Sequence, residues 1–201
     1  MKCLIFLAIT FSVISTHGQQ GYADSLRVYL DDYITKHEVV KSQDKNLFRF
    51  YPANEDYRIT AKFVPATNAN WFSMETSGSV KKTHRVYGSV HFLIGDTTVA
   101  LNVYQSQNLL TLDQYKDYLF LPFTDLTSGD ETYTAGRYLD LKMSDIINGQ
   151  IALDFNKAYN PYCAYVSGKY NCPIPPKENR LAVAIRAGEK TFAASATGTV
   201  K

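Results

Sequence analysis

Residues 86–104 read VYGSVHFLIGDTTVALNVY, and this stretch decides the fold class. β-Branched and aromatic residues dominate on both sides of Gly95-Asp96, as is typical of strands. The central glycine can take the positive φ that a tight turn needs. The stretch therefore predicts a β-hairpin with strands at Val86–Ile94 and Thr98–Tyr104.

The same two-residue period recurs on both sides of this hairpin. Ile59, Ala61 and Phe63 alternate with polar residues, as expected of a strand with one buried face. Residues typical of turns, such as Asn148-Gly149, separate the apolar runs. The further predicted strands are Tyr118–Phe123, Tyr133–Leu141, Ile151–Phe155 and Leu181–Ala187. We therefore expect a mainly β protein, with a single barrel- or sandwich-like domain over residues 47–192.

The period is different before residue 47. Apolar residues recur there every three or four positions, at Tyr22, Leu26, Tyr29, Leu30 and Tyr33. This spacing predicts one amphipathic helix over Asp24–His37. A polar connection over Lys41–Asn46 completes an N-terminal helical region, residues 19–46, that precedes the β-domain.

Residues 1–18 have the pattern of a cleavable signal peptide. Lys2 provides the positive start, Cys3–Ile14 is apolar, and Thr16 and Gly18 are the small residues before a cleavage site. The apolar run is shorter than the roughly 20 residues of a spanning helix, although an uncleaved anchor stays an alternative. We expect an exported protein, periplasmic or extracellular, without stable membrane insertion after cleavage. The small and polar residues 193–201 predict a flexible tail.

Composition narrows the class of protein further. Of the 201 residues, 45% are hydrophobic and 20% are charged, which excludes long-range disorder. Lys and Arg number 21 against 19 Asp and Glu, and a net charge of +2 is too small for an electrostatic nucleic-acid binder. The length suits one domain with a sizeable core.

Two cysteines remain beyond the signal segment, Cys163 and Cys172. In an exported protein such a pair most often forms a disulfide. Zinc normally takes four Cys or His ligands, and no histidine follows His91. A metal held by the two cysteines with two carboxylates, and a reactive thiol pair, stay as alternatives, and we expect no metal site.

Two polar stretches interrupt the alternation, at residues 121–137 and 153–189. They contain the candidate ligand-binding residues Asp125, Thr127, Ser128, Arg137, Asp154, Asn156, Tyr159 and Asn160. The Arg137 guanidinium matches a carboxylate or phosphate, but Asp125 or Asp154 can equally pair with it as a structural partner. Asp and Asn side chains in such loops can also simply satisfy backbone donors.

The same stretches resemble a bacterial family named Domain of Unknown Function 1684. A first phrase, F-x-D-x-T-S-G-x-x-T-Y-x-x-G-R, is matched over Phe123–Arg137. A second, D-F-N-x-A-Y-N-P-x-C-A, is matched over Asp154–Ala164. A third, C-P-x-P-P-x-x-N-R-L followed by A-G-E, is matched over Cys172–Leu181 and Ala187–Glu189. The resemblance covers roughly residues 45 to 190 and implies no particular activity or cofactor.

Three interpretations of function stay open at this point. The first is an exported β-domain that binds a small polar or anionic ligand at the loop cluster. The second is a hydrolase that uses a pocket of Asp125, Arg137, Asp154 and Tyr159, in which one carboxylate acts as acid or base. The third is a purely structural polar network. The sequence has no nucleophile elbow, dinucleotide fingerprint or phosphate-binding loop, so it assigns no catalytic residue.

Overall fold

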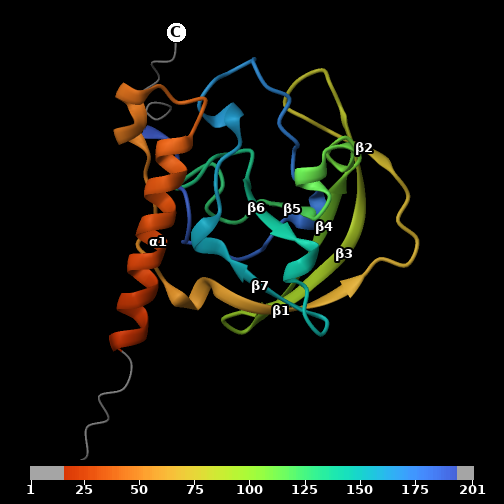
Figure 1. The fold of residues 1–201 in the computed structure, drawn as a ribbon, viewed down its shortest axis with the longest axis horizontal. Coiled ribbons are helices and arrows are strands. Elements are labelled where there is room, and N and C mark those ends of the chain that lie inside the picture. The colour runs from red at the N-terminus through yellow and green to blue at the C-terminus, as the bar shows by residue number, and fades with distance from the viewer. Residues whose placement is uncertain (1–15, 194–201) are drawn as a thin grey trace, which may run out of the picture.

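The computed structural model describes residues 16–193. An N-terminal helix, α1 (Thr16–Lys36), precedes a β-sheet, as Figure 1 shows. The strands are β1 (Arg58–Pro65), β2 (Phe72–Met74), β3 (Lys82–Ile94), β4 (Thr97–Ser106), β5 (Tyr118–Phe123), β6 (Arg137–Lys142) and β7 (Gln150–Asp154). Short 3-10 turns lie in the connections: η1 (Ser42–Leu47), η2 (Glu55–Tyr57), η3 (Leu109–Thr111), η4 (Asp113–Tyr115), η5 (Met143–Asp145), η6 (Phe155–Lys157), η7 (Tyr162–Ala164) and η8 (Lys177–Asn179).

The strands form one antiparallel sheet in the order β6-β5-β4-β3-β1-β7, with β2 added to β3. The sheet curls into a half-barrel, and α1 stands beside it (Figure 1). The segment after β7 returns to β6, where Tyr138 and Tyr159 exchange two backbone hydrogen bonds of 2.9 and 3.0 Å. The predicted mainly β fold with one N-terminal helix is confirmed.

The predicted hairpin is present as β3 and β4. Ile94 pairs with Thr97, and Gly95 between them has a φ of 54°, the positive value that the turn requires. The register shifts between Val86 and Gly88, so a bulge bends β3. The bend helps the long hairpin to follow the curvature of the half-barrel.

The main core fills the inside of the half-barrel. Alternate residues of the strands other than β2 point inward, as the two-residue period predicts. The fully enclosed members include Ala61, Val90, Leu101, Val103, Leu119, Leu121, Phe123, Ile151, Leu153 and Phe155. Burial of this apolar surface is the main stabilising contribution to the fold.

Helix α1 is attached by a separate aromatic cluster. Tyr33 packs against Phe48, Tyr165 and Phe192, which belong to segments before and after the sheet. Leu26, nearer the start of the helix, is 4% exposed. None of the helices in residues 16–193 has the length and apolar character needed to cross a membrane.

Some element boundaries were wrong at the sequence level. The helix begins at Thr16 rather than Asp24 and ends at Lys36 rather than His37. β6 begins at Arg137 rather than Tyr133, because residues 133–136 form a turn in which Gly136 has a φ of 90°. The strand β2 was not predicted. The expected signal peptide, apart from residues 16–18, and all but the first residue of the expected flexible tail lie outside the described residues.

The predicted strand Leu181–Ala187 is also wrong. Its alternate residues Leu181, Ile185 and Ala187 are buried, so the two-residue period is real. Its backbone, however, belongs to no strand of the sheet and is held by backbone hydrogen bonds to Thr124 and Leu126 and by the side chains of Asp125 and Arg137. Periodicity indicates which side chains are buried, but it does not reveal which groups form hydrogen bonds with the backbone N–H and C=O groups.

Candidate ligand-binding site

A cleft of about 530 Å³ lies between α1 and the outer face of β6. Six tyrosines contribute to it, so we call it the tyrosine cleft. Its lining is Tyr29, Asp32, Tyr33, Lys36, His37, Lys82, Tyr138, Asp140, Tyr159, Pro161, Tyr162, Tyr170, Asn171, Cys172 and Pro173. Clefts of this size, with aromatic walls and a few polar groups, are typical of small-molecule sites.

Strand β6 provides the base of the cleft. Leu139 and Leu141 point into the main core, so their neighbours Tyr138 and Asp140 point the opposite way, toward the cleft. Tyr159 is placed beside them by its backbone pairing with Tyr138. The base is therefore built on the sheet and not on a free loop.

A carboxylate with two tyrosines lies at this base. The Tyr159 hydroxyl donates to Asp140 Oδ1 at 2.7 Å, and the Tyr118 hydroxyl donates to the same oxygen at 2.8 Å. Burial raises the pKa of Asp140, while the two hydroxyls partly offset this rise. Burial likewise raises the pKa of both tyrosines far above the ordinary value, so both stay protonated donors.

The rim of the cleft is charged. On α1, Lys36 Nζ lies 2.8 Å from Asp32 Oδ1, one helical turn away, and both side chains are exposed. Across the cleft, Lys82 begins β3, and burial lowers its pKa. The predicted disulfide joins Cys163 to Cys172, and Cys172 is part of the cleft wall.

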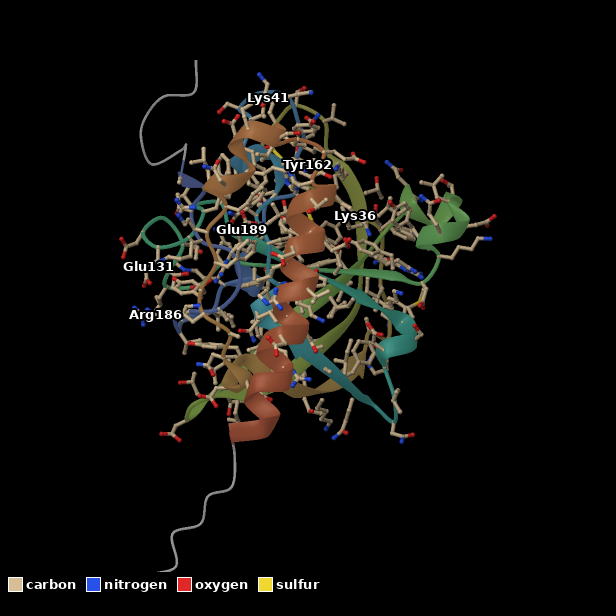
Figure 2. All side chains as sticks on the ribbon, turned by 60° about the vertical axis from the view of Figure 1, so that its left-hand side comes forward. Lys36, Lys41, Glu131, Tyr162, Arg186 and Glu189 are labelled. Carbon is tan, nitrogen blue, oxygen red and sulfur yellow. A yellow bond between two sulfur atoms is a disulfide. The ribbon has the colours of Figure 1, made fainter. Side chains whose placement is uncertain are left out.

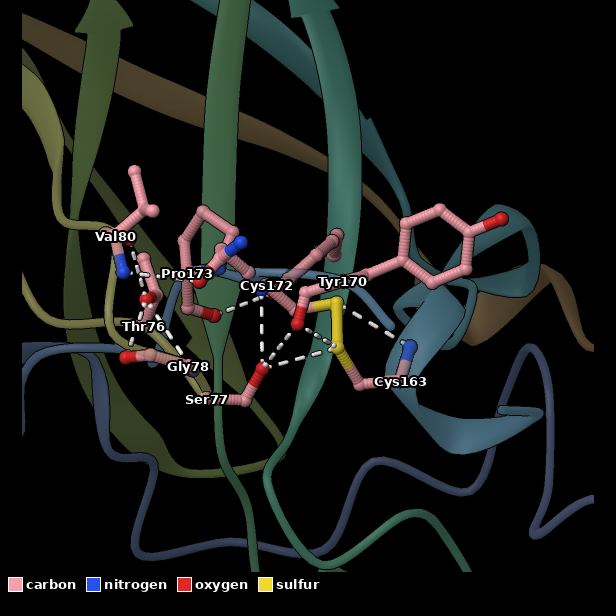
Figure 3. Close-up of a disulfide and its surroundings, with 10 residues drawn as sticks. Thr76, Ser77, Gly78, Val80, Cys163, Tyr170, Cys172 and Pro173 are labelled. Carbon is pink, nitrogen blue, oxygen red and sulfur yellow. Dashed lines mark hydrogen bonds between the residues drawn. A yellow bond between two sulfur atoms is a disulfide. The ribbon is translucent and has the colours of Figure 1, made fainter. Parts of the chain in front are cut away.

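The disulfide is anchored to the loop after β2 (Figure 3). The Ser77 hydroxyl accepts from the Cys172 backbone N–H at 3.1 Å and lies 3.0 Å from Cys163 Sγ. The Ser77 backbone N–H donates to the Cys172 carbonyl at 2.9 Å. These contacts fix the wall formed by Tyr170, Cys172 and their neighbours.

A buried carboxylate lies close to the helix, beside the cleft. Glu189 is fully buried and accepts from the hydroxyls of Tyr33 and Tyr165 and from the Asn160 backbone N–H at 2.9 Å. Burial raises the pKa of Glu189 to about 7, and these hydrogen bonds limit the rise. Figure 2 shows Glu189, Lys36 and Tyr162 near the C-terminal end of α1. Glu189 attaches the helix that forms one wall of the cleft.

The candidate residues of the first polar stretch are enclosed elsewhere. Arg137 Nη2 donates to Asp125 Oδ2 at 2.9 Å, and neither side chain has any exposed surface. Asp125 Oδ1 also accepts from the backbone and hydroxyl of Thr127, and the Ser128 hydroxyl accepts from the Asp125 backbone N–H at 3.1 Å. The guanidinium is thus occupied by a structural partner, one of the two alternatives that the sequence left open.

The four candidate residues of the second polar stretch have separate partners, except that the Asn156 amide nitrogen also donates to Asp154 Oδ1 at 3.1 Å. Asn156 is buried and bonds the backbone of Asn54 through both its amide oxygen and nitrogen. Asp154 accepts from the Tyr22 hydroxyl at 2.9 Å at the foot of α1. The Asn160 side chain donates to the Lys190 carbonyl at 2.8 Å. Tyr159 is the candidate that lines the tyrosine cleft.

The eight candidates therefore do not form one pocket. Sequence reasoning also missed Asp140 and Tyr138 as cleft residues, and Tyr118 as a donor to Asp140. A signal for two of them was present, since Tyr138 and Asp140 alternate with Leu139 and Leu141 and must share the opposite face. Within residues 16–193, no group of three or more His, Cys, Asp or Glu side chains is arranged to hold a metal ion.

The class of protein defined here is an antiparallel half-barrel closed on one side by an N-terminal helix. It is similar to the solution structure of an uncharacterised protein from Haloarcula marismortui, with a TM-score of 0.64 and 26% identity. That similarity covers 87% of this chain and 96% of the other. No curated protein matches the chain. Residues 46–190 match the model of DUF1684, a family described as protein of unknown function, and the chain belongs to that family.

Proposed function

We propose that this protein binds a small polar ligand in the tyrosine cleft. The observation that carries the proposal is the cleft of about 530 Å³ with the Asp140 carboxylate at its base, held by the hydroxyls of Tyr118 and Tyr159. Tyrosine rings provide rigid contact area at little entropic cost, and a positioned carboxylate provides orientation and selectivity.

The position of the cleft supports this assignment over the loop cluster considered first. Asp125 and Arg137 have no exposed surface, so an anionic ligand would have to displace a buried ion pair to reach the guanidinium. Removing one partner of such a pair costs about 3–5 kcal/mol. The cleft requires no such rearrangement.

The hydrolase alternative receives less support from the same geometry. Of its four residues, Asp154 and Tyr159 share a smaller hollow of about 160 Å³ beside the cleft. Asp125 and Arg137 lie away from it and are enclosed. A carboxylate and an arginine therefore do not face one reacting centre, as acid–base catalysis on an anionic substrate would require.

Export to an oxidising compartment is part of the proposal. The Cys163–Cys172 disulfide supports it, because structural disulfides persist mainly outside the cytosol. The apolar run Cys3–Ile14 preceded by Lys2 supports it as well. Amino-terminal sequencing of the protein recovered from culture medium or from a periplasmic extract tests the cleavage after Gly18.

The binding proposal is tested by ligand-observed NMR with a library of small polar metabolites. Tyr29 and Val28 provide a matched pair, because they are adjacent exposed residues of α1 and only Tyr29 lines the cleft. Alanine suits an exposed helical position, so both variants should fold. We expect Tyr29→Ala to weaken binding of the hits and Val28→Ala to leave it unchanged. Equal binding by both variants, or no hit for the wild type, would contradict the proposal.

A further inference from the structure

The Asp140 carboxylate is an unpaired negative charge within the tyrosine cleft. Both hydroxyls that it accepts donate to Oδ1, and no hydrogen bond in the described part of the chain reaches Oδ2. The ion pairs of residues 16–193 do not include it. No cation contributes to the shift of its pKa, which burial raises. Asp140 keeps exposed surface at the cleft, and a carboxylate there without a cation can accept a positively charged group from outside.

Lys82 is the complementary unpaired charge in the same cleft. The ion pairs of the described chain do not include it either, and its half-buried position lowers its pKa by burial alone. No ion pair of the described chain joins Lys82 to Asp140. The other rim charges, Asp32 and Lys36, neutralise each other at 2.8 Å.

The surface near these two charges is aromatic. Tyr138 and Tyr159 line the cleft together with Asp140 and Lys82, and their rings meet edge to face with centroids 5.8 Å apart. Tyrosine faces attract ammonium groups through the ring quadrupole, which adds to the attraction of the carboxylate. An amine beside Asp140 would therefore meet both a negative charge and aromatic surface.

From this arrangement we infer that the ligand of the tyrosine cleft is a small zwitterion, whose ammonium group binds Asp140 and whose anionic group binds Lys82. This inference rests on the proposed binding function and adds the chemical class of the ligand. A ligand with both charges neutralises both unpaired groups of the cleft, whereas a ligand with one charge leaves the other group desolvated and unpaired.

The test uses three matched sets of compounds in ligand-observed NMR. The first set is the common α-amino acids, the second is the corresponding amines without the carboxylate, and the third is the corresponding carboxylic acids without the amine. The library of small polar metabolites is run in parallel. We expect hits among the amino acids, with binding about tenfold weaker or lost in the matched amine and acid.

Variants of Asp140 and Lys82 test which charged group of the ligand each residue binds. Asp140→Asn keeps the shape and an acceptor for the two tyrosines, and Lys82→Gln removes the ammonium; each should weaken the amino-acid hit about tenfold or more. Lys82→Arg keeps the charge and should retain most of the binding. Asp96→Asn and Lys41→Gln remove exposed charges outside the cleft and should have no effect. Unchanged unfolding midpoints show that each variant is folded.

The results separate the inference from the proposed function. Hits confined to the amines or to the acids would overturn the inference of a zwitterionic ligand and would still support the proposed binding function. A library compound whose binding depends on Tyr29 but is unchanged by Asp140→Asn and Lys82→Gln would lead to the same conclusion. Absence of any hit in all sets contradicts both.

Discussion

Arg137 and Asp125 form an ion pair of 2.9 Å in which neither side chain is exposed. The same guanidinium donates to the carbonyls of Ile185 at 2.8 Å and Ala187 at 2.5 Å. Asp125 Oδ1 accepts from the Ile185 backbone N–H at 3.2 Å. The two side chains thus hold residues 185–187 against the main core, while residues 181–183 are held by backbone hydrogen bonds to Thr124 and Leu126.

Removal of Arg137 should therefore destabilise the fold strongly. Arg137→Ala leaves Asp125 buried and unpaired and frees several backbone carbonyls, so we expect the free energy of unfolding to fall by about 3–5 kcal/mol. Urea unfolding measures the loss. Arg186→Ala is the control, because its exposed pair with Glu131 should contribute little. Equal losses in the two variants would show that the buried pair does not hold the segment.

Stability should depend on pH through Glu189. Its folded-state pKa of about 7 lies above its ordinary value of 4.5, so the folded state retains a proton that the unfolded state releases. The stability that this proton contributes is therefore fully present below pH 4.5 and is lost as the pH rises through 7, by about 3 kcal/mol in total. Denaturation at a series of pH values, with Glu189→Gln as reference, isolates this loss.

His37 belongs to the same aromatic cluster and changes the stability with pH in the opposite direction. Burial lowers its pKa from 6.5 to about 4, so its contribution is present above pH 6.5 and is lost as pH falls through 4. The two groups partly cancel in wild type between pH 4.5 and 6.5. The stability of wild type relative to Glu189→Gln should still fall steadily from pH 4.5 toward pH 7. A difference independent of pH would contradict the assignment to Glu189.

Loss of the disulfide should weaken both the fold and the cleft wall. The bond joins residues nine positions apart, and closing so short a loop contributes about 2–3 kcal/mol in the chain-entropy model. We expect Cys163→Ser/Cys172→Ser to unfold at lower urea concentration by that amount. Reductant should reproduce the shift in wild type and leave the double variant unchanged. A wild type whose unfolding is insensitive to reductant would contradict this expectation.

Gly136 should tolerate no side chain. Its φ is 90°, and a Cβ there would lie 2.4 Å from the Phe123 carbonyl oxygen in β5. Gly136→Ala should destabilise by more than about 2 kcal/mol through backbone strain and displacement of the neighbouring strand. Gly95 also has a positive φ but open space around it, so Gly95→Ala should cost about 1 kcal/mol. Thermal unfolding of the two variants separates the cost of the steric contact with β5 from the cost of the positive φ alone.

Local patterns were sufficient for most of the sheet. The hairpin at Gly95 follows from apolar residues with strand propensity on either side of a turn dipeptide, and Tyr118–Phe123 was predicted at its observed bounds. The disulfide followed from two cysteines and an expected export. The hairpin and strand depend on residues close together in the sequence, and the disulfide has only one possible pairing beyond the signal segment, so one sequence is enough to predict them.

The candidate site was predictable only in part. Polar residues gathered in two stretches. The alternation of Arg137, Leu139 and Leu141 with Tyr138 and Asp140 separates the two faces, but the sequence could not show that Asp125 would neutralise Arg137 or that a cleft would form at Asp140. The turn at Gly136 sets the start of β6, and this start decides which face each residue occupies. Tyr118 and Tyr159 meet at Asp140 from separate segments, and no local spacing contains that contact.

The sequence by itself determined a mainly β chain with one amphipathic N-terminal helix, since side-chain periodicity reports which residues are buried. Tertiary structure decided which polar groups neutralise one another and which stay open to a ligand. Asp125 met Arg137 and was enclosed, whereas Asp140 met only two tyrosine hydroxyls at an accessible cleft. The physical reason is that electrostatic pairing depends on distance in space, and the curled sheet and helix α1 set those distances.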